Sequence, residues 1–350
     1  MRRNFVEALE KARKEESLNK EEIVTLLEAQ GDELESLFSA AAEMTRKYVG
    51  DEVHIRGLVE FSNFCGKNCD YCGLRRGNKE AHRYRLSPQE IVEAAKEIEK
   101  QGIGTIVLQA GEDAWYTGEK MAEIIKEIKK QTNLAVTVSI GERPKADYAL
   151  WKEAGADRYL LKQEIVNQKI FAAIHPDDVL EERIACLRSL KEIGYQLGSG
   201  FMIGLPGQTL EDIAEDILFL RNEGVEMAGI GPFIPHHQTP LADLPAGDVN
   251  LTLKAVAVTR LVTKDTLLPS TTATETLAPG EGQKRSLQAG ANVIMINMTP
   301  GIYRKDYQIY PGKVAVQFEQ VKQLIASQGK KIGQGAGHSF RYLRKEEGGI

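Results

Sequence analysis

Eight short apolar segments alternate with amphipathic segments between residues 53 and 296, and this alternation restricts the fold more than any other feature of the chain. Parallel strands need a crossover connection, which is usually an amphipathic helix. Eight such units predict a complete (β/α)8 barrel of the TIM type, and an incomplete barrel of six units is the alternative. The expected strands are 53–61, 105–109, 134–139, 158–161, 197–203, 227–233, 267–272 and 292–296, and the expected helices are 87–102, 118–130, 145–153, 178–193, 210–222, 251–264 and 281–288.

Two further segments flank the expected barrel, which spans residues 51–312. Residues 1–50 show helical stripes of apolar side chains, and Asn19 with Glu22 has the spacing of a capping box. We expect this extension to form two or three helices that cover one end of the barrel. Residues 313–350 are expected to hold a helix near 314–328 and a tail.

The composition is that of an ordinary globular protein. Hydrophobic residues make up 42% and charged residues 27% of the chain, so it can bury a sizeable core. The net charge of -5 gives no support for a nucleic-acid partner, and no apolar run reaches the length of a membrane span. The N-terminus leads into a charged helix rather than a signal peptide, so we expect a cytoplasmic protein with reduced thiols.

Three of the four cysteines lie within eight residues, directly after the first expected strand. Cys65, Cys69 and Cys72 have the spacing C-x3-C-x2-C, with Tyr71 just before the last cysteine. Closely spaced thiolates usually hold a soft metal or an iron–sulfur cluster. Three thiolates in one loop can hold three corners of a four-iron cubane, which leaves one iron open to a small molecule.

Other interpretations of these cysteines are less favoured. A zinc site normally needs four ligands, and the fourth cysteine, Cys186, is distant on an expected helix, where we interpret it as a small buried hydrophobe. A disulfide does not suit a chain without secretion signals. The loop therefore indicates an iron–sulfur centre at the end of the barrel where the first strand finishes.

Polar side chains follow several expected strands, at the end where (β/α)8 barrels carry their chemistry. Gly111 and Glu112 follow the second strand, where a carboxylate can accept hydrogen bonds from an amino group. His236 and His237 end the sixth strand, and we interpret them as a pocket wall because no third metal ligand is evident. For the other candidates the alternatives are a polar rim, a surface ion pair or an aromatic core. These candidates are Thr137, Ser139, Glu164, Thr271, Thr272, Tyr303, Tyr307 and Tyr310, together with Arg158 and Lys162, which flank the fourth strand and could face an anion, and Arg183 on the next helix.

Together these features resemble the radical SAM superfamily, and within it the HydE group of FeFe-hydrogenase maturases, which is related to the biotin and methylornithine synthases. The resemblance implies a 4Fe-4S cluster and S-adenosylmethionine (SAM) at one mouth of the barrel. It also implies reductive cleavage of SAM to a 5'-deoxyadenosyl radical, in building the hydrogenase H-cluster from a cysteine-bound iron carbonyl cyanide precursor. The matching segments are 61–63, 71–76, 108–113, 155–161, 204–209, 229–236, 290–295 and 310–313.

The resemblance further implies roles for individual residues and partners. Cys65, Cys69 and Cys72 would hold a single cluster, and Tyr307 would lie beside the radical site. The implied SAM contacts are Tyr71, Gln109, Gly111, Glu112, Thr137, Ser139, Glu164, Arg183 and Met202, and the implied substrate or anion contacts are Arg158, Lys162, Thr271 and Thr272. Implied partners are a small-molecule or organometallic substrate, a reductant protein of the flavodoxin or ferredoxin type, and other hydrogenase maturases.

The chain departs from the family pattern in two places. Some members carry further cysteines near the C-terminus for a second cluster, but residues 313–350 contain none, so we expect one cluster. Lys162 stands where arginine is common, and a lysine ammonium binds anions as a point charge rather than a planar fork. The alternatives are a radical SAM mutase or synthase of the methylornithine or biotin synthase type, and a non-enzymatic iron–sulfur carrier.

Overall fold

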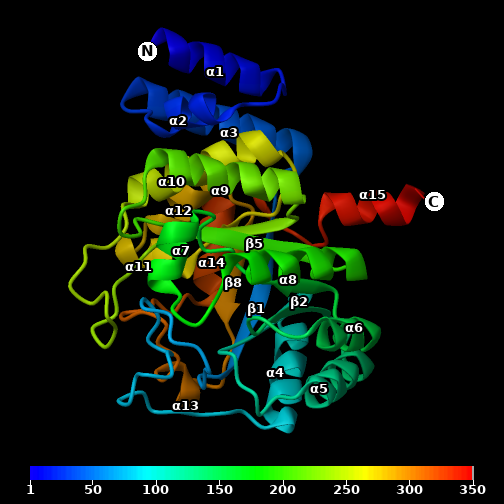
Figure 1. The fold of residues 1–350 in the computed structure, drawn as a ribbon. Coiled ribbons are helices and arrows are strands. Elements are labelled where there is room, and N and C mark those ends of the chain that lie inside the picture. Colours follow the sequence, from blue (N-terminus) through cyan, green and yellow to red (C-terminus); the bar gives the residue numbers. More distant parts are fainter. Residues whose placement is uncertain (349–350) are drawn as a thin grey trace.

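The computed structural model describes residues 1–348, and a barrel of eight parallel strands forms its centre (Figure 1). The strands lie in the order β6-β5-β4-β3-β2-β1-β8-β7. The barrel closes at Leu267, just before β7, where the Leu267 N–H donates to Glu226 O and the Ala228 N–H to Leu267 O, both at 2.9 Å. The complete (β/α)8 barrel is thus confirmed, and the six-unit alternative is wrong. The strands are β1 (Glu52–Ser62), β2 (Thr105–Ala110), β3 (Ala135–Ser139), β4 (Arg158–Leu160), β5 (Gln196–Ile203), β6 (Met227–Pro232), β7 (Pro269–Ser270) and β8 (Val293–Asn297).

Helices connect the strands, and the longer ones cover the outside of the barrel, since each has an apolar side that packs into the core around the sheet. The short α7 packs instead in a separate apolar cluster with Met202 and Phe233. The expected capping box at Asn19 and Glu22 is confirmed, and helix α4 begins with a second box at Ser87 and Glu90. The barrel helices are α4 (Pro88–Lys100), α5 (Gly118–Gln131), α6 (Lys145–Glu153), α7 (Gln168–Ile174), α8 (Leu180–Ile193), α9 (Leu210–Glu223), α10 (Val249–Thr263), α11 (Thr272–Leu277) and α12 (Gly282–Gln288).

Strand β7 is shorter than the segment 267–272 that the sequence predicts. The Thr271 side chain accepts a hydrogen bond from the Thr274 backbone N–H and so caps helix α11. Thr272 is therefore helical, and the prediction of a strand through Thr272 is wrong. The short helices α7 and α11 are also absent from the sequence-based assignment, because one or two turns carry too little periodic pattern.

The three N-terminal helices lie against outer helices rather than over an end of the barrel. Helices α1 (Arg3–Arg13), α2 (Lys20–Leu27) and α3 (Asp32–Tyr48) form a layer beside α9 and α10, at the top of Figure 1. The expected number of helices is confirmed, but their expected place over a barrel end is wrong. The division of the chain at residues 50 and 312 stays a prediction.

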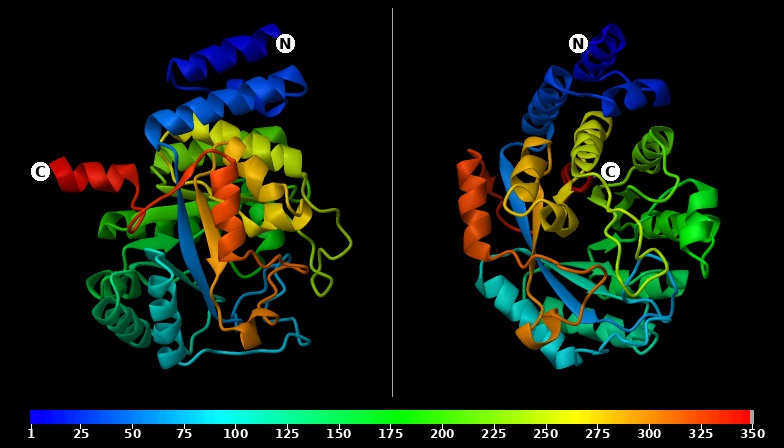
Figure 2. Two further views of the ribbon diagram at one scale, coloured as in Figure 1. Left: turned by 180° about the vertical axis from the view of Figure 1, so that it is seen from behind. Right: turned by 90° about the vertical axis from the view of Figure 1, so that its left-hand side faces the viewer.

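The C-terminal segment closes the end of the barrel opposite the cysteine loop. It comprises α14 (Phe318–Ser327), β9 (Lys331–Ile332) and α15 (Phe340–Gly348), and α14 lies on the outside of the barrel in both views of Figure 2. Helix α13 (Gly301–Arg304), which precedes this segment, lies instead at the end with the cysteine loop, where Tyr303 stacks on Tyr84. Strand β9 pairs with the start of β1. The following loop is pressed against the barrel, since a Cβ on Gly104 would lie 1.9 Å from Gly335 O. In the described part of the chain, no helix has both the length and the apolar character needed to cross a bilayer.

Candidate active site

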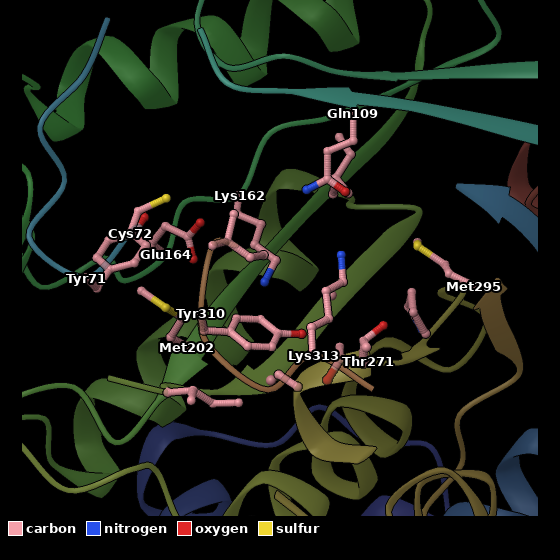
Figure 3. A pocket seen from close by; sticks show the side chains of 18 of the residues that line it. Tyr71, Cys72, Gln109, Lys162, Glu164, Met202, Thr271, Met295, Tyr310 and Lys313 are labelled. Carbon is pink, nitrogen blue, oxygen red and sulfur yellow. The ribbon is translucent and has the colours of Figure 1, made fainter. Parts of the chain in front are cut away.

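A cavity of about 320 Å³ lies inside the barrel, among residues at and beyond the carboxyl ends of the strands. The side chains of Lys162 and Lys313 point into it from opposite walls, and Glu164 lies beside Tyr71 and Cys72 (Figure 3). The residues that the sequence singles out and that line this cavity are Cys65, Tyr71, Cys72, Gln109, Gly111, Lys162, Glu164, Met202, Thr271, Thr272, Tyr307 and Tyr310.

The cysteine loop leaves β1 and is held against the turn that follows β2. The Gly66 N–H donates to Glu112 O at 2.9 Å. Gly111 must be glycine here, because a Cβ would lie 2.3 Å from Phe64 O. Arg83 secures the other side of the loop, donating to the carbonyl oxygens of Leu74 at 2.9 Å and Arg75 at 2.8 Å. The loop is thus positioned by backbone contacts before any metal binds.

The three thiols of the loop are electrostatically coupled. Burial raises the pKa of all three thiols, Cys65, Cys69 and Cys72. The neighbouring sulfurs raise the pKa of Cys69 and Cys72 further, and that of Cys72 reaches about 12. A bound cationic metal reverses this preference, because coordination deprotonates a thiol. Three adjoining sulfurs are donors suited to a soft metal or an iron–sulfur cluster, so the residues present fit a cluster.

A second possible metal group shares one of these thiols. Ligand atoms of Cys69, His175 and Asp178 lie within 4.8 Å of one another. However, His175 also contacts the Tyr71 hydroxyl through Nε2 at 3.3 Å, and Asp178 is ion-paired with Lys67 and, at 3.0 Å, with Arg183. These partners occupy the donor atoms, so we interpret His175 and Asp178 as supports of the cysteine loop.

Glu112 is positioned beside the loop in a largely buried environment. Its Oε1 accepts a hydrogen bond from the Glu142 N–H at 3.0 Å, and its Oε2 lies 3.8 Å from Lys67 Nζ. Gly141 has φ of +77°, and a Cβ there would lie 2.1 Å from the Glu112 side chain. Burial raises the pKa of Glu112 to about 7, because the charged carboxylate is poorly solvated there. A cationic partner would therefore stabilise the ionised form.

Glu164 combines an unusual backbone with an unsatisfied carboxylate oxygen. Its φ is 63°, a region that residues other than glycine rarely adopt, and its backbone is held between Gly200 O and the Met202 N–H, each at 3.0 Å. Among the described residues, neither its Oε2 nor the buried Thr137 Oγ1 has a hydrogen-bond partner. Because such orphaned atoms are costly, the Glu164 carboxylate at the cavity wall favours a ligand that carries hydrogen-bond donors.

Arg158 is the main exception to the predicted placement. It begins β4, as the expected strand 158–161 predicts, but it is 1% exposed and donates to Thr105 Oγ1 at 3.2 Å and to Ala336 O at 2.7 Å. These partners lie at the end of the barrel that the C-terminal loop closes, so Arg158 does not reach the cavity wall. Thr137, Ser139, Cys69, Glu112 and Arg183 surround the cavity without lining it.

Other candidates also lie away from the cavity. Tyr303 stacks on Tyr84 with ring centroids 4.9 Å apart, so of the three candidate tyrosines after the last strand only Tyr307 and Tyr310 line the cavity. His236 and His237 stack on each other at 4.6 Å and line a separate hollow. Cys186 lies on α8 with a partly buried thiol.

Several residues of the site escaped the sequence analysis. His175 and Asp178 follow helix α7 and carry no motif that distinguishes them from surface residues. Lys313 forms an ion pair with Glu60, which comes from β1 and accepts from Asn297 at 2.7 Å. An acidic side chain within an apolar strand was the available signal for Glu60, because a buried carboxylate needs a partner.

The barrel, the thiol loop and the surrounding polar groups define a radical SAM enzyme, and residues 59–220 match the Radical SAM superfamily. The chain belongs to the HydE family. It is 52% identical to the FeFe-hydrogenase maturase subunit HydE of Thermotoga maritima, over 86% of this chain and 87% of that protein. It is 28% identical to 3-methylornithine synthase of Methanosarcina acetivorans, over 75% of this chain and 74% of that protein. The crystal structure of methylornithine synthase (PylB) has the same fold, with a TM-score of 0.84 and 24% identity, covering 93% of this chain and 97% of the other. The superfamily implies a 4Fe-4S cluster and SAM as cofactors.

We expect SAM binding to depend on the ionisation of Glu112. Since the pKa of this carboxyl is raised to about 7, the affinity for SAM should fall as the pH is lowered through that value. Glu112→Gln should weaken binding by about 1.5–3 kcal/mol and remove this acidic limb, because the charge-assisted hydrogen bond is lost. Calorimetric titration of SAM at several pH values measures both effects. The exposed Glu119→Gln on α5 is the control, and an unchanged pH profile in Glu112→Gln would exclude Glu112 from the site.

Proposed function

We propose that this enzyme acts in hydrogenase H-cluster maturation, on a cysteine-bound iron carbonyl cyanide precursor. When bound, the cluster and SAM supply an electron and a 5'-deoxyadenosyl radical. The observation that carries the proposal is the cavity itself, which joins the cysteine loop to two lysines within one enclosed barrel. The similarity to HydE supports the same assignment.

The residues around the cysteine loop would hold the cofactors. Cys65, Cys69 and Cys72 would bind one cluster, with Tyr71 beside the adenine. Glu112 would accept hydrogen bonds from the amino group of SAM, and Glu164 would accept them from the ribose. Further SAM contacts in this proposal are Gln109, Gly111, Thr137, Ser139, Arg183 and Met202.

The opposite part of the cavity would hold the substrate. No ion pair is recorded for Lys162 among the described residues, so its ammonium is available to an anionic group. Lys313 is paired with Glu60 and lies 5.4 Å from the ring centroid of Tyr307. Thr271 and Thr272 add hydroxyl groups on the same wall. Two ammonium groups and several hydroxyls suit an anionic metal cyanide better than a cationic amino acid such as lysine. Arg158 would act from the closed end of the barrel, where its hydrogen bond to Ala336 O holds the C-terminal loop in place.

Anaerobic turnover with different substrates tests this function. Reconstituted protein is incubated with SAM and dithionite, and 5'-deoxyadenosine is quantified. The iron carbonyl cyanide complex should raise its formation well above the uncoupled background and be consumed in step, whereas lysine and ornithine should have no effect. Stimulation by lysine with methylornithine as the product would replace the maturase assignment by the mutase alternative. Other hydrogenase maturases would supply or receive the iron complex.

A further inference from the structure

Helix α9 carries a fully buried carboxyl group that the proposed site does not use. Asp216 is 0% exposed, and its Oδ1 accepts a hydrogen bond from the Val166 N–H at 2.8 Å. Among the described residues its Oδ2 has no hydrogen-bond partner. Burying a carboxyl group in this way is costly, so the contact with Val166 indicates what the side chain is there to hold.

The segment that Asp216 holds, residues 163–167, contains Glu164. Val166 lies two residues after Glu164, whose backbone is left-handed and whose side chain lines the central cavity. A left-handed conformation is costly for a residue with a side chain, and it persists where the surrounding contacts impose it. The direction of the Glu164 carboxylate therefore depends on the contacts on both sides of this residue.

Strand β5 supplies the contacts before and at Glu164. The Oε1 atom of Gln163 accepts hydrogen bonds from Ser199 Oγ at 2.5 Å and from the Gly200 N–H at 3.0 Å. The backbone of Glu164 itself is bonded to Gly200 and Met202 of the same strand. Strand β5 thus fixes the chain as far as Glu164, and Asp216 fixes the chain just beyond it.

A second acid on α9 extends the contact to the start of α7. Asp212 lies one turn before Asp216 on the same side of the helix, and its Oδ1 accepts from Asn167 Nδ2 at 2.7 Å. Asp212 also completes the capping box of α9 with Thr209, so its replacement would disturb the start of the helix. Asp216 lies within the helix, away from that cap, so its contact with Val166 can be tested separately.

We propose that Asp216 is a positioning residue for SAM binding, which acts through Glu164 by holding the Val166 N–H. The inference rests on the proposed function, in which the Glu164 carboxylate accepts hydrogen bonds from the ribose of SAM. Without Asp216 the buried Val166 N–H is left unsatisfied, so the segment relaxes and the carboxylate moves away from the ribose. Burial outweighs the hydrogen bond from Val166 and raises the pKa of Asp216, which favours the neutral acid. Asparagine, which is neutral and similar in shape, should therefore replace it.

Calorimetric titration of SAM into anaerobically reconstituted variants tests this role. Asp216→Leu should weaken SAM binding by about tenfold, the effect of losing a buried hydrogen bond, and Asp216→Asn should bind within about twofold of wild type. Asp216→Ser, with a side chain one bond shorter, gives the same comparison if Asp216→Leu does not fold. Leu220→Ala on the same helix is the control, because it removes a fully buried core side chain and lowers stability without touching residues 163–167. Its SAM affinity should equal that of wild type, and the iron content should be the same in every variant.

A double-mutant cycle shows whether Asp216 acts through Glu164. Glu164→Gln should weaken SAM binding by itself, and adding Asp216→Leu should have little further effect, because the carboxylate that Asp216 positions is already lost. Additive losses, or an equal loss in Leu220→Ala, would overturn the inference. A loss in Glu164→Gln without one in Asp216→Leu would overturn the inference alone, whereas unchanged affinity in Glu164→Gln would refute the ribose contact as well.

Discussion

Alanine at any one of Cys65, Cys69 or Cys72 is expected to abolish cluster binding. Wild-type protein reconstituted anaerobically should hold about four irons, the content of one cubane. A cubane with two protein thiolates is poorly held, so each variant should lose its iron, its charge-transfer absorbance and its cleavage of SAM. Iron analysis and visible spectra measure the loss directly. The backbone contacts that position the loop, such as the Gly66 hydrogen bond to Glu112 O, remain in each variant.

Cys186→Ala provides the matched control for these substitutions. Its thiol lies on α8, outside the loop, so the variant should retain its iron. The pattern of loss also separates a cluster from the group formed by Cys69, His175 and Asp178. A metal bound by that group would survive Cys65→Ala and Cys72→Ala and would be lost in His175→Ala. Retention of metal in Cys65→Ala with loss in Cys186→Ala would contradict the assignment of the loop.

The fold was accessible to sequence analysis because its signals are periodic and local. Alternating strands and helices, together with capping residues such as Ser87, predict all eight strands of the barrel. The loop that closes the opposite end, residues 333–339, has no comparable period and is rich in glycine. Its position depends on contacts with distant residues, including Arg158 and Gln196. The misplacement of Arg158 has the same origin, since its partners are invisible in the local sequence.

The site was predictable where chemistry depends on spacing, and hidden where it depends on tertiary contacts. The three cysteines and Glu112 belong to short motifs that occupy the expected strand ends. His175 is a single histidine whose role follows from its contacts with Cys69 and Tyr71. The positive φ of Glu164 likewise cannot be predicted from a glutamate in an unremarkable segment. Such strained positions are where local propensity is expected to fail.

Arg183→Leu is expected to destabilise the protein by about 3–5 kcal/mol, the cost of leaving buried carboxylates without their cation. Arg183 on α8 is 6% exposed and donates to Glu142 at 2.7 Å and to Asp178 at 3.0 Å. Asp178 in turn pairs with Lys67 of the cysteine loop, so the loss of the Arg183 guanidinium should also destabilise the conformation of that loop. Chemical denaturation of the cluster-free protein measures the difference. Arg188→Leu on the same helix is the control and should cost less than about 1 kcal/mol, because that side chain is 61% exposed.

The pH dependence of this difference identifies its electrostatic origin. Burial alone favours neutral Asp178, but hydrogen bonds from His175 and Lys67 and the charge of Arg183 outweigh it and hold the pKa of Asp178 well below its usual range. A carboxyl with a depressed pKa stabilises the folded state fully above its unfolded pKa of about 3.9, and this contribution is lost as the pH falls toward the folded value. The difference in the free energy of unfolding between wild type and Arg183→Leu should therefore be constant from pH 5 to 7 and become smaller below about pH 4. If this difference in unfolding free energy stayed constant below pH 4, Arg183 would be shown to act by packing alone.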